Sequence, residues 1–267
     1  MTRTRQPAVA GAFYPGNPAI LSATVDRLLA NARYDPSIHP KALIAPHAGY
    51  VYSGSTAAEA YAAVAPWADQ IRRVILLGPT HRVAVNGLAL PETEAFSTPL
   101  GTIRIDTQAI ASIADLPQIV FSDQAHAFEH SLEVHLPFLQ RVLPQFTLVP
   151  LAVGHASPED VAEVLDTLWG GPETLIVVSS DLSHFLPYGT AQQVDGNTCK
   201  HILQLDTHIR PDQACGAYPV NGLLLAAARR GLKPTLLGLC NSGDTAGDRS
   251  RVVGYAAFSF EEQKLHA

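Results

Sequence analysis

Histidine and aspartate residues recur in the short polar segments that follow apolar runs of this sequence. They are His47 after residues 43–45, His81 after 74–77, Asp181 and His184 after 176–178, and Asp244 after 236–239. Imidazole and carboxylate groups serve as metal ligands and as general acids or bases. Taken singly, each has an ordinary alternative role: a histidine caps the next helix, Asp181 is an N-cap, or Asp244 is a turn residue beside Gly243.

The repetition of this pattern favours a common site. In open α/β sheets, ligands bind outside the carboxyl ends of the strands. If the apolar segments are neighbouring parallel strands, the three histidines and two aspartates converge at one edge of the sheet. We therefore favour a metal or acid–base site over separate structural roles.

A second polar cluster spans residues 129–137, EHSLEVHLP. It is not the zincin HExxH pattern, because His130 and His135 are five residues apart. On a helix over residues 130–143, His130 and Glu133 share one face while His135 points away. One interpretation is that His130 faces the site with Glu133 orienting an imidazole. The alternative is a polar helix start that faces solvent.

The three cysteines, Cys199, Cys215 and Cys240, include no closely spaced pair. This argues against a disulfide framework or zinc ribbon and favours a reducing compartment, with the cytoplasm as the default. Cys199 and Cys215 are predicted to be inert, buried residues. Cys240 lies near the predicted site and is a weaker candidate ligand, although a buried thiol at a strand end is the simpler interpretation.

The elements that must position these residues follow from hydrophobic patterning. Short runs rich in Val, Ile and Leu alternate with helical patterns, which predicts an α/β fold with a central, mostly parallel or mixed sheet flanked by helices. Expected strands are 42–45, 73–77, 88–90, 147–152, 174–179, 235–239 and 252–260. Expected helices are 19–32, 53–64, 107–113, 130–143, 158–169, 189–211 and 220–230. The pattern never stops and restarts, which predicts a single domain over residues 1–267.

Composition narrows the classes of function. Of 267 residues, 47% are hydrophobic and 16% charged, with a net charge of -6 and no Lys/Arg run. A nucleic-acid-binding protein would show a basic stripe, so we expect no nucleic-acid partner. The longest apolar runs are strand-sized, and Pro7, Gly11 and Pro15 interrupt the only candidate signal segment, so we expect no membrane partner.

Five motifs together resemble the Memo family in order and spacing. They are residues 6–15 (QPAVAGAFYP), 45–50 (APHAGY), 77–81 (LGPTH), 129–137 (EHSLEVHLP) and 178–184 (VSSDLSH). Residues 241–244 (NSGD) and 250–257 (SRVVGYAA) are similar to the form in bacterial members, of the AmmeMemoRadiSam system protein B type. The resemblance covers essentially the whole chain.

The resemblance implies a fold like the catalytic subunit of class III extradiol dioxygenases, which hold non-haem iron(II) with two histidines and an acidic residue. Carried over by position, His47 and His81 correspond to the histidine ligands. His184 corresponds to the acid–base histidine, with Asp181 beside it, and His130 corresponds to a pocket histidine.

The third ligand departs from animal Memo proteins, whose cysteine would fall near Thr245. Asp244 is adjacent and would restore the acidic ligand, giving the two-histidine, one-carboxylate set typical of iron(II). We expect iron(II), with copper or zinc as alternatives.

The leading hypothesis is a dioxygenase-like, iron(II)-dependent oxidoreductase that acts on a small aromatic or related substrate. The alternatives are a metal-dependent hydrolase and a non-catalytic metal-binding or signalling scaffold. The resemblance also implies pathway partners of the AMMECR and radical-enzyme types.

Overall fold

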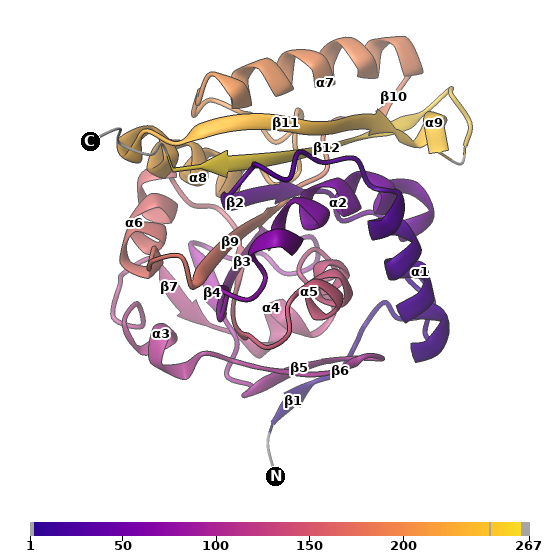
Figure 1. Cartoon of the computed structure of the whole chain (residues 1–267). Helices are drawn as coiled ribbons and strands as arrows, with labels where there is room; N and C mark the ends of the chain where they lie inside the picture. Colours follow the sequence, from indigo (N-terminus) through magenta and orange to yellow (C-terminus); the bar gives the residue numbers. More distant parts are fainter. Residues whose placement is uncertain (1–2, 246, 263–267) are drawn as a thin grey trace.

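A nine-stranded mixed sheet forms the centre of the protein (Figure 1). The structure is a computed structural model that describes residues 3–245 and 247–262. The strand order is β10-β12-β2-β9-β3-β8-β4-β7, and β11 also pairs with β12. The strands are β2 (Pro40–Ala45), β3 (Arg73–Pro79), β4 (Leu88–Leu90), β7 (Ile119–Phe121), β8 (Thr147–Val153), β9 (Thr174–Ser179), β10 (His184–Leu186), β11 (Lys233–Asn241) and β12 (Val252–Glu261).

Four neighbouring strands, β2, β9, β3 and β8, are parallel to one another. Their residues are almost all buried, as expected of parallel strands that are covered on both faces. Their carboxyl ends therefore lie at one edge of the sheet. β12 runs antiparallel to β2, and β11 antiparallel to β12, so β11 again points towards that edge.

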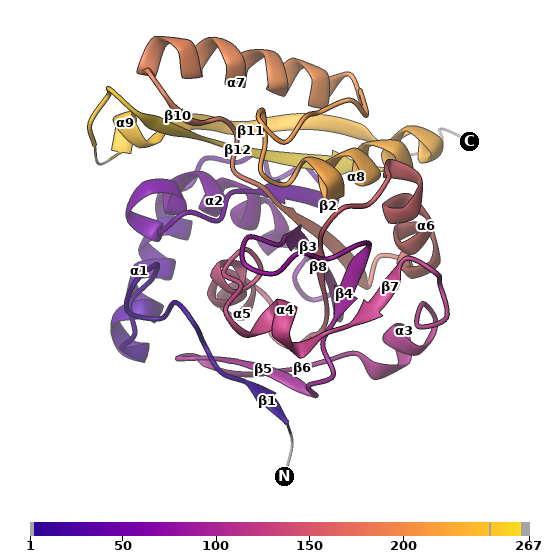
Figure 2. The same ribbon diagram turned by 180° about the vertical axis from the view of Figure 1, so that it is seen from behind.

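Helices cover both faces of the sheet (Figures 1 and 2). On one face, α1 (Pro18–Asn31), α2 (Tyr50–Val64) and α5 (Leu136–Val142) bury Leu43 and Leu76. On the other, α3 (Thr107–Ala111), α6 (Pro158–Leu168), α7 (Tyr188–Leu203) and α8 (Ala217–Arg230) bury Ile44 and Leu77. Successive strand residues point to opposite faces, so the same strands fill both cores.

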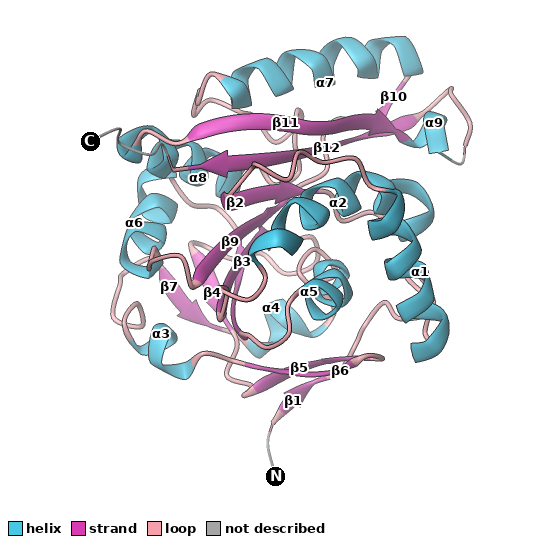
Figure 3. Ribbon diagram, viewed as in Figure 1, coloured by secondary structure: helices cyan, strands magenta, loops and turns pink. Residues whose placement is uncertain are grey.

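The remaining elements are short (Figure 3). A separate three-stranded sheet joins β1 (Thr4–Arg5), β5 (Ala95–Thr98) and β6 (Gly101–Arg104). The 3-10 helices η1 (Ala65–Trp67) and η2 (Glu133–His135) and the helices α4 (Asp123–Ala127) and α9 (Ser242–Thr245) complete the order. No helix in the described ranges combines the length and apolarity needed to cross a membrane.

The structure confirms the predicted mixed α/β architecture and corrects two helices. The expected helix over 189–211 ends at Leu203 as α7. The expected helix over 130–143 is instead a turn, then η2 and then α5. The Glu129 carboxylate accepts the backbone N–H groups of His130 and Ser131, which holds residues 130–132 outside a helix. Such local side-chain bonds offer the backbone an alternative to helical hydrogen bonding.

Candidate metal centre

Two predicted ligands meet across the end of β9. His47 follows β2 and His81 follows β3, the two strands on either side of β9. Their ring centroids lie 5.2 Å apart. β9 ends at Ser179, whose small side chain leaves room for the imidazoles to approach each other. Parallel neighbours thus bring together residues that are 34 positions apart in sequence.

His130 completes the cluster from the turn between α4 and η2. Its ring centroid is 5.3 Å from that of His47 and 4.7 Å from that of His81. Potential ligand atoms of the three side chains all lie within 4.8 Å of one another. Two nitrogens that share a metal at about 2.1 Å lie roughly 3–3.5 Å apart, so an ion would draw the rings slightly closer.

Gly78 allows the turn that carries His130 to approach the sheet. A Cβ at Gly78 would lie 2.8 Å from Ser131 Oγ and 3.0 Å from Leu132 Cδ2. The Ser131 hydroxyl donates to the Pro79 carbonyl at 2.8 Å, which ties this turn to the end of β3. Glycine in this LGPTH segment therefore leaves room for the side chains of Ser131 and Leu132 to pack against the end of β3.

Hydrogen bonds at Nδ1 fix the tautomers of His47 and His81. The Ser179 hydroxyl donates its hydrogen to Ser131 O, so its oxygen accepts from His47 Nδ1 at 2.6 Å. The Glu129 carboxylate accepts from His81 Nδ1 at 2.9 Å. Both rings therefore keep their Nε2 lone pair for a metal, and a carboxylate behind a ligating imidazole is the usual supporting arrangement.

Glu129 organises the cluster, a role that the sequence interpretation gave to Glu133. The carboxylate accepts from the backbone N–H groups of His81, His130 and Ser131 and from the His81 ring. Burial alone would raise the pKa of Glu129, but these bonds outweigh it and lower the pKa to about 2. An ionised carboxylate therefore lies directly behind the histidines.

Glu133 instead anchors the N-terminal segment. Its fully buried carboxylate accepts from Arg5, from the backbone of Ala8 and Val9, and from the Tyr14 hydroxyl. It does not orient an imidazole, and neither does it face solvent. The anchored segment includes Phe13, whose ring packs 4.8 Å from that of His130. Glu133 thus shapes the site indirectly.

The cluster favours neutral imidazoles. Burial lowers the pKa of His47 well below its ordinary value, and burial lowers the pKa of His130 to about 4. Neighbouring histidines reinforce the effect at His47. Metal binding requires neutral imidazole, so protons compete weakly with an ion at these two residues.

The predicted acid–base residues line a pocket of about 520 Å³ that also includes His130. Asp181 Oδ1 accepts from the backbone N–H of His47 at 2.8 Å, and its Oδ2 lies 3.9 Å from His47 Nε2. Burial raises the pKa of Asp181 to about 7. His184 Nδ1 donates to the carbonyl of Leu182 at 2.8 Å, so its Nε2 remains an acceptor.

Asp244 does not join the histidine cluster. β12 lies between β11 and β2, so the end of β11 starts about two strand spacings, roughly 10 Å, from the end of β2. The α9 turn directs the exposed carboxylate to the Tyr188 hydroxyl at 2.6 Å and to the backbone N–H of Asn241 at 3.0 Å. His130 occupies the third position expected for Asp244.

Among the cysteines, Cys215 differs from expectation. Cys240 contacts Thr56 Oγ1 and lies outside the cluster, whereas Cys215 Sγ lies 3.4 Å from His47 Nε2. Because Nδ1 of His47 carries the ring proton, the thiol donates to Nε2. No spacing signal in the sequence places Cys215, which precedes α8, beside the end of β2.

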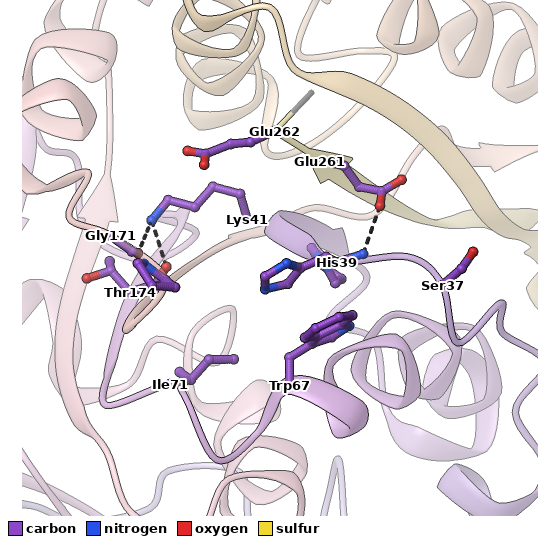
Figure 4. A pocket seen from close by; sticks show the side chains of 11 residues that line it. Ser37, His39, Lys41, Trp67, Ile71, Gly171, Thr174, Glu261 and Glu262 are labelled. Carbon is purple, nitrogen blue, oxygen red and sulfur yellow. Dashed lines mark hydrogen bonds between the residues drawn. The ribbon is translucent and has the colours of Figure 1, made fainter. Parts of the chain in front are cut away.

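A second cavity, of about 480 Å³, lies at the opposite edge of the sheet (Figure 4). It surrounds the amino ends of β2 and β9, where the His39 and Trp67 rings stack 3.9 Å apart. The buried Lys41 ammonium donates to the carbonyls of Trp169, Gly171 and Thr174, which use all three of its donors. These bonds secure the chain before β9 and leave the ammonium no donor for a ligand.

Several known proteins are similar to this chain along nearly its whole length. Residues 5–259 match the Memo family, described as Memo-like protein. A MEMO1 family protein from Aquifex aeolicus (strain VF5) is 36% identical over 97% of this chain and 99% of its own length. Another MEMO1 family protein, from Methanosarcina barkeri (strain Fusaro / DSM 804), is 35% identical over 96% of this chain and 100% of its own length. A solved structure, the uncharacterized protein JW3007 from Escherichia coli K12, is similar over 96% of this chain and 99% of that one, at 11% identity and a TM-score of 0.47.

Proposed function

The chain belongs to the Memo family, and we propose that it is a non-haem iron(II)-dependent, dioxygenase-like oxidoreductase acting on a small aromatic substrate. The observation that supports this most is the cluster of His47, His81 and His130, of which His130 also lines the pocket that holds Asp181 and His184. His47 and His81 both keep Nε2 unprotonated because Nδ1 donates a hydrogen bond, and Nε2 of His47 accepts from the Cys215 thiol, which an ion would displace. Imidazole suits iron, copper and zinc alike, so the donor set fits the proposed ion without selecting it.

When bound, iron(II) would supply a Lewis acid and the redox chemistry with dioxygen. The protein supplies the proton transfers. His184 Nε2 is free to take a proton from a substrate hydroxyl and later return it. Burial raises the pKa of Asp181 to about 7. This carboxyl group can therefore hold a second proton close to His47 near neutral pH.

Metal analysis of anaerobically purified protein, followed by iron(II) reconstitution, tests the proposal. We expect stoichiometric iron and dioxygen uptake with catechol-type substrates. His81→Ala should lose the metal, whereas His184→Gln should keep it and lose turnover. Loss of metal from His184→Gln would make His184 a ligand, and iron-loaded protein that consumes no dioxygen with any such substrate would refute the redox function.

One observation favours a second candidate, a zinc-dependent hydrolase. Three histidines with an open fourth position form a known catalytic zinc arrangement that lowers the pKa of bound water. Here the third group of the cluster is His130, not the expected carboxylate. Zinc-dependent ester cleavage, abolished by His81→Ala and absent from the iron form, would establish this function instead.

A further inference from the structure

Phe185 and Arg251 line the same pocket as His130, Asp181 and His184. Phe185 directly follows His184 in β10, and Arg251 directly precedes β12. The guanidinium carbon of Arg251 lies 5.0 Å from the centre of the Phe185 ring. The pocket therefore reaches from a histidine cluster to an exposed pair made of an aromatic ring and a cation.

Phe185 is held in an unfavourable conformation. Its φ is 59°, a left-handed value that it shares with only one other non-glycine residue of the described ranges, Leu205. Its side chain is 60% exposed, so burial gives back little of the conformational cost. Bulky residues keep such a φ only where the surrounding structure imposes it.

The imposing structure is an irregularity in the β10–β12 pairing. His184 pairs with Val253 and Leu186 with Val252, so the register shifts at Phe185. Bulges of this kind re-aim a side chain and are common beside active sites. The shift leaves His184 in the pocket and directs the next side chain along the pocket as well.

Among the described residues, the Arg251 side chain has no hydrogen-bond acceptor. Within residues 3–245 and 247–262, no hydrogen bond or ion pair engages its guanidinium. Asp248 also lines the pocket, but its carboxylate accepts from the backbone N–H and the hydroxyl of Ser250. Arg249, two residues away, differs: it stacks 4.4 Å from the Tyr188 ring and donates to Gly243 O.

We infer that the pocket takes a substrate with a flat apolar part, which packs on Phe185, and an acidic group, which Arg251 binds. A guanidinium presents paired donors that match the two oxygens of a carboxylate or a phosphate. The other end of the substrate then points towards His130 and His184. This inference rests on the proposed function, because it treats the pocket as the substrate site of the histidine cluster.

Binding of three fluorescent probes that share a naphthalene ring tests the inference: 2-naphthoate, 2-naphthyl phosphate and the neutral 2-naphthamide, at fixed ionic strength. We expect the wild type to bind at least one anion about tenfold or more tightly than the amide. Whichever anion binds more tightly identifies a carboxylate or a phosphate as the natural group. Arg251→Gln should reduce the affinity for the anion to that for the amide. Arg249→Gln is the matched control and should leave all three affinities unchanged. Phe185→Leu should weaken all three probes alike.

Equal affinity for anion and amide in the wild type would overturn the inference, and so would equal losses in Arg251→Gln and Arg249→Gln. Metal content of each variant is measured in parallel. Retained metal without anion preference refutes the substrate class and leaves the proposed function intact. Anion preference in protein that binds no metal refutes the proposed function alone.

Discussion

Replacing Glu129 by glutamine tests whether this carboxylate organises the metal centre. Oε2 accepts from the His81 backbone N–H at 2.6 Å, and Oε1 accepts from the His81 ring and from two further backbone N–H groups. Glutamine retains one acceptor oxygen. If that oxygen takes the position of Oε1, the amide nitrogen faces the backbone N–H of His81. Both groups are donors, so the charge-assisted hydrogen bond to this N–H is lost.

The magnitude follows from that lost bond and from the lost charge. A hydrogen bond to a charged group contributes about 1.5–3 kcal/mol, which sets the expected loss in the free energy of unfolding of metal-free protein. Removing a group that supports a metal ligand typically weakens metal binding about 10- to 100-fold. We therefore expect Glu129→Gln to fold and to bind iron(II) 10- to 100-fold more weakly.

Anaerobic competition with a chromogenic chelator measures the affinity, and urea unfolding of metal-free protein measures stability. Glu133→Gln is the matched control, because Glu133 is equally buried and equally bonded but anchors the N-terminal segment. It should lose stability and keep iron affinity within about twofold. If it does not fold, Tyr14→Phe removes a single donor from the same carboxylate and serves in its place.

Two results would refute this reasoning. Unchanged iron affinity in Glu129→Gln would show that His81 needs no charged partner. Equal losses of affinity in Glu129→Gln and in the control would show that general destabilisation, and not the local bond to His81, controls binding.

Three further predictions concern the surroundings of the cluster. Cys215→Ala removes the thiol that donates to His47 Nε2 and should tighten metal binding about 2- to 10-fold. Cys199→Ala is the control. Weaker metal binding by Cys215→Ala would show that the Cys215 sulfur is a ligand. Asp244→Ala should leave iron affinity within about twofold, because its carboxylate bonds elsewhere, and a tenfold loss would restore it as a ligand. Burial lowers the pKa of His135 to about 3. Between pH 6.5 and 3, therefore, this imidazole is protonated in the unfolded chain but not in the folded protein. Metal-free protein should therefore lose about 2 kcal/mol from this residue between pH 6.5 and 5, and His135→Phe should show a shallower decline in urea unfolding.

The strand ends could be predicted from the sequence because one rule governs them. Apolar runs before His47, His81 and Asp181 predicted buried parallel strands, and parallel neighbours must bring their carboxyl ends to one edge. The same rule misplaced Asp244. Its strand also ends at this edge, but the sequence does not indicate that β12 lies between it and β2.

The 129–137 segment shows where periodicity fails. The helical pattern paired His130 with Glu133, whereas a carboxylate that caps its own following backbone prevents the helix from starting there. The adjacent Glu129 was visible in the same motif as an acidic residue beside a candidate ligand. The contact of Cys215 with His47 spans 168 positions and had no local signal.

Charge balance links the metal centre to the outer pocket. Two of the cluster histidines, His47 and His130, are held neutral by burial, and the carboxylate directly behind the cluster is the ionised Glu129. Burial disfavours ionisation of Asp181 below about pH 7. The ionised carboxylate of Asp248 and the guanidinium of Arg251 both line the pocket and offset each other, so a divalent ion beside Glu129 would leave net positive charge there. Opposite charge is favoured in such a partly desolvated space, so loading the cluster with a divalent metal should increase the preference for anionic over neutral probes.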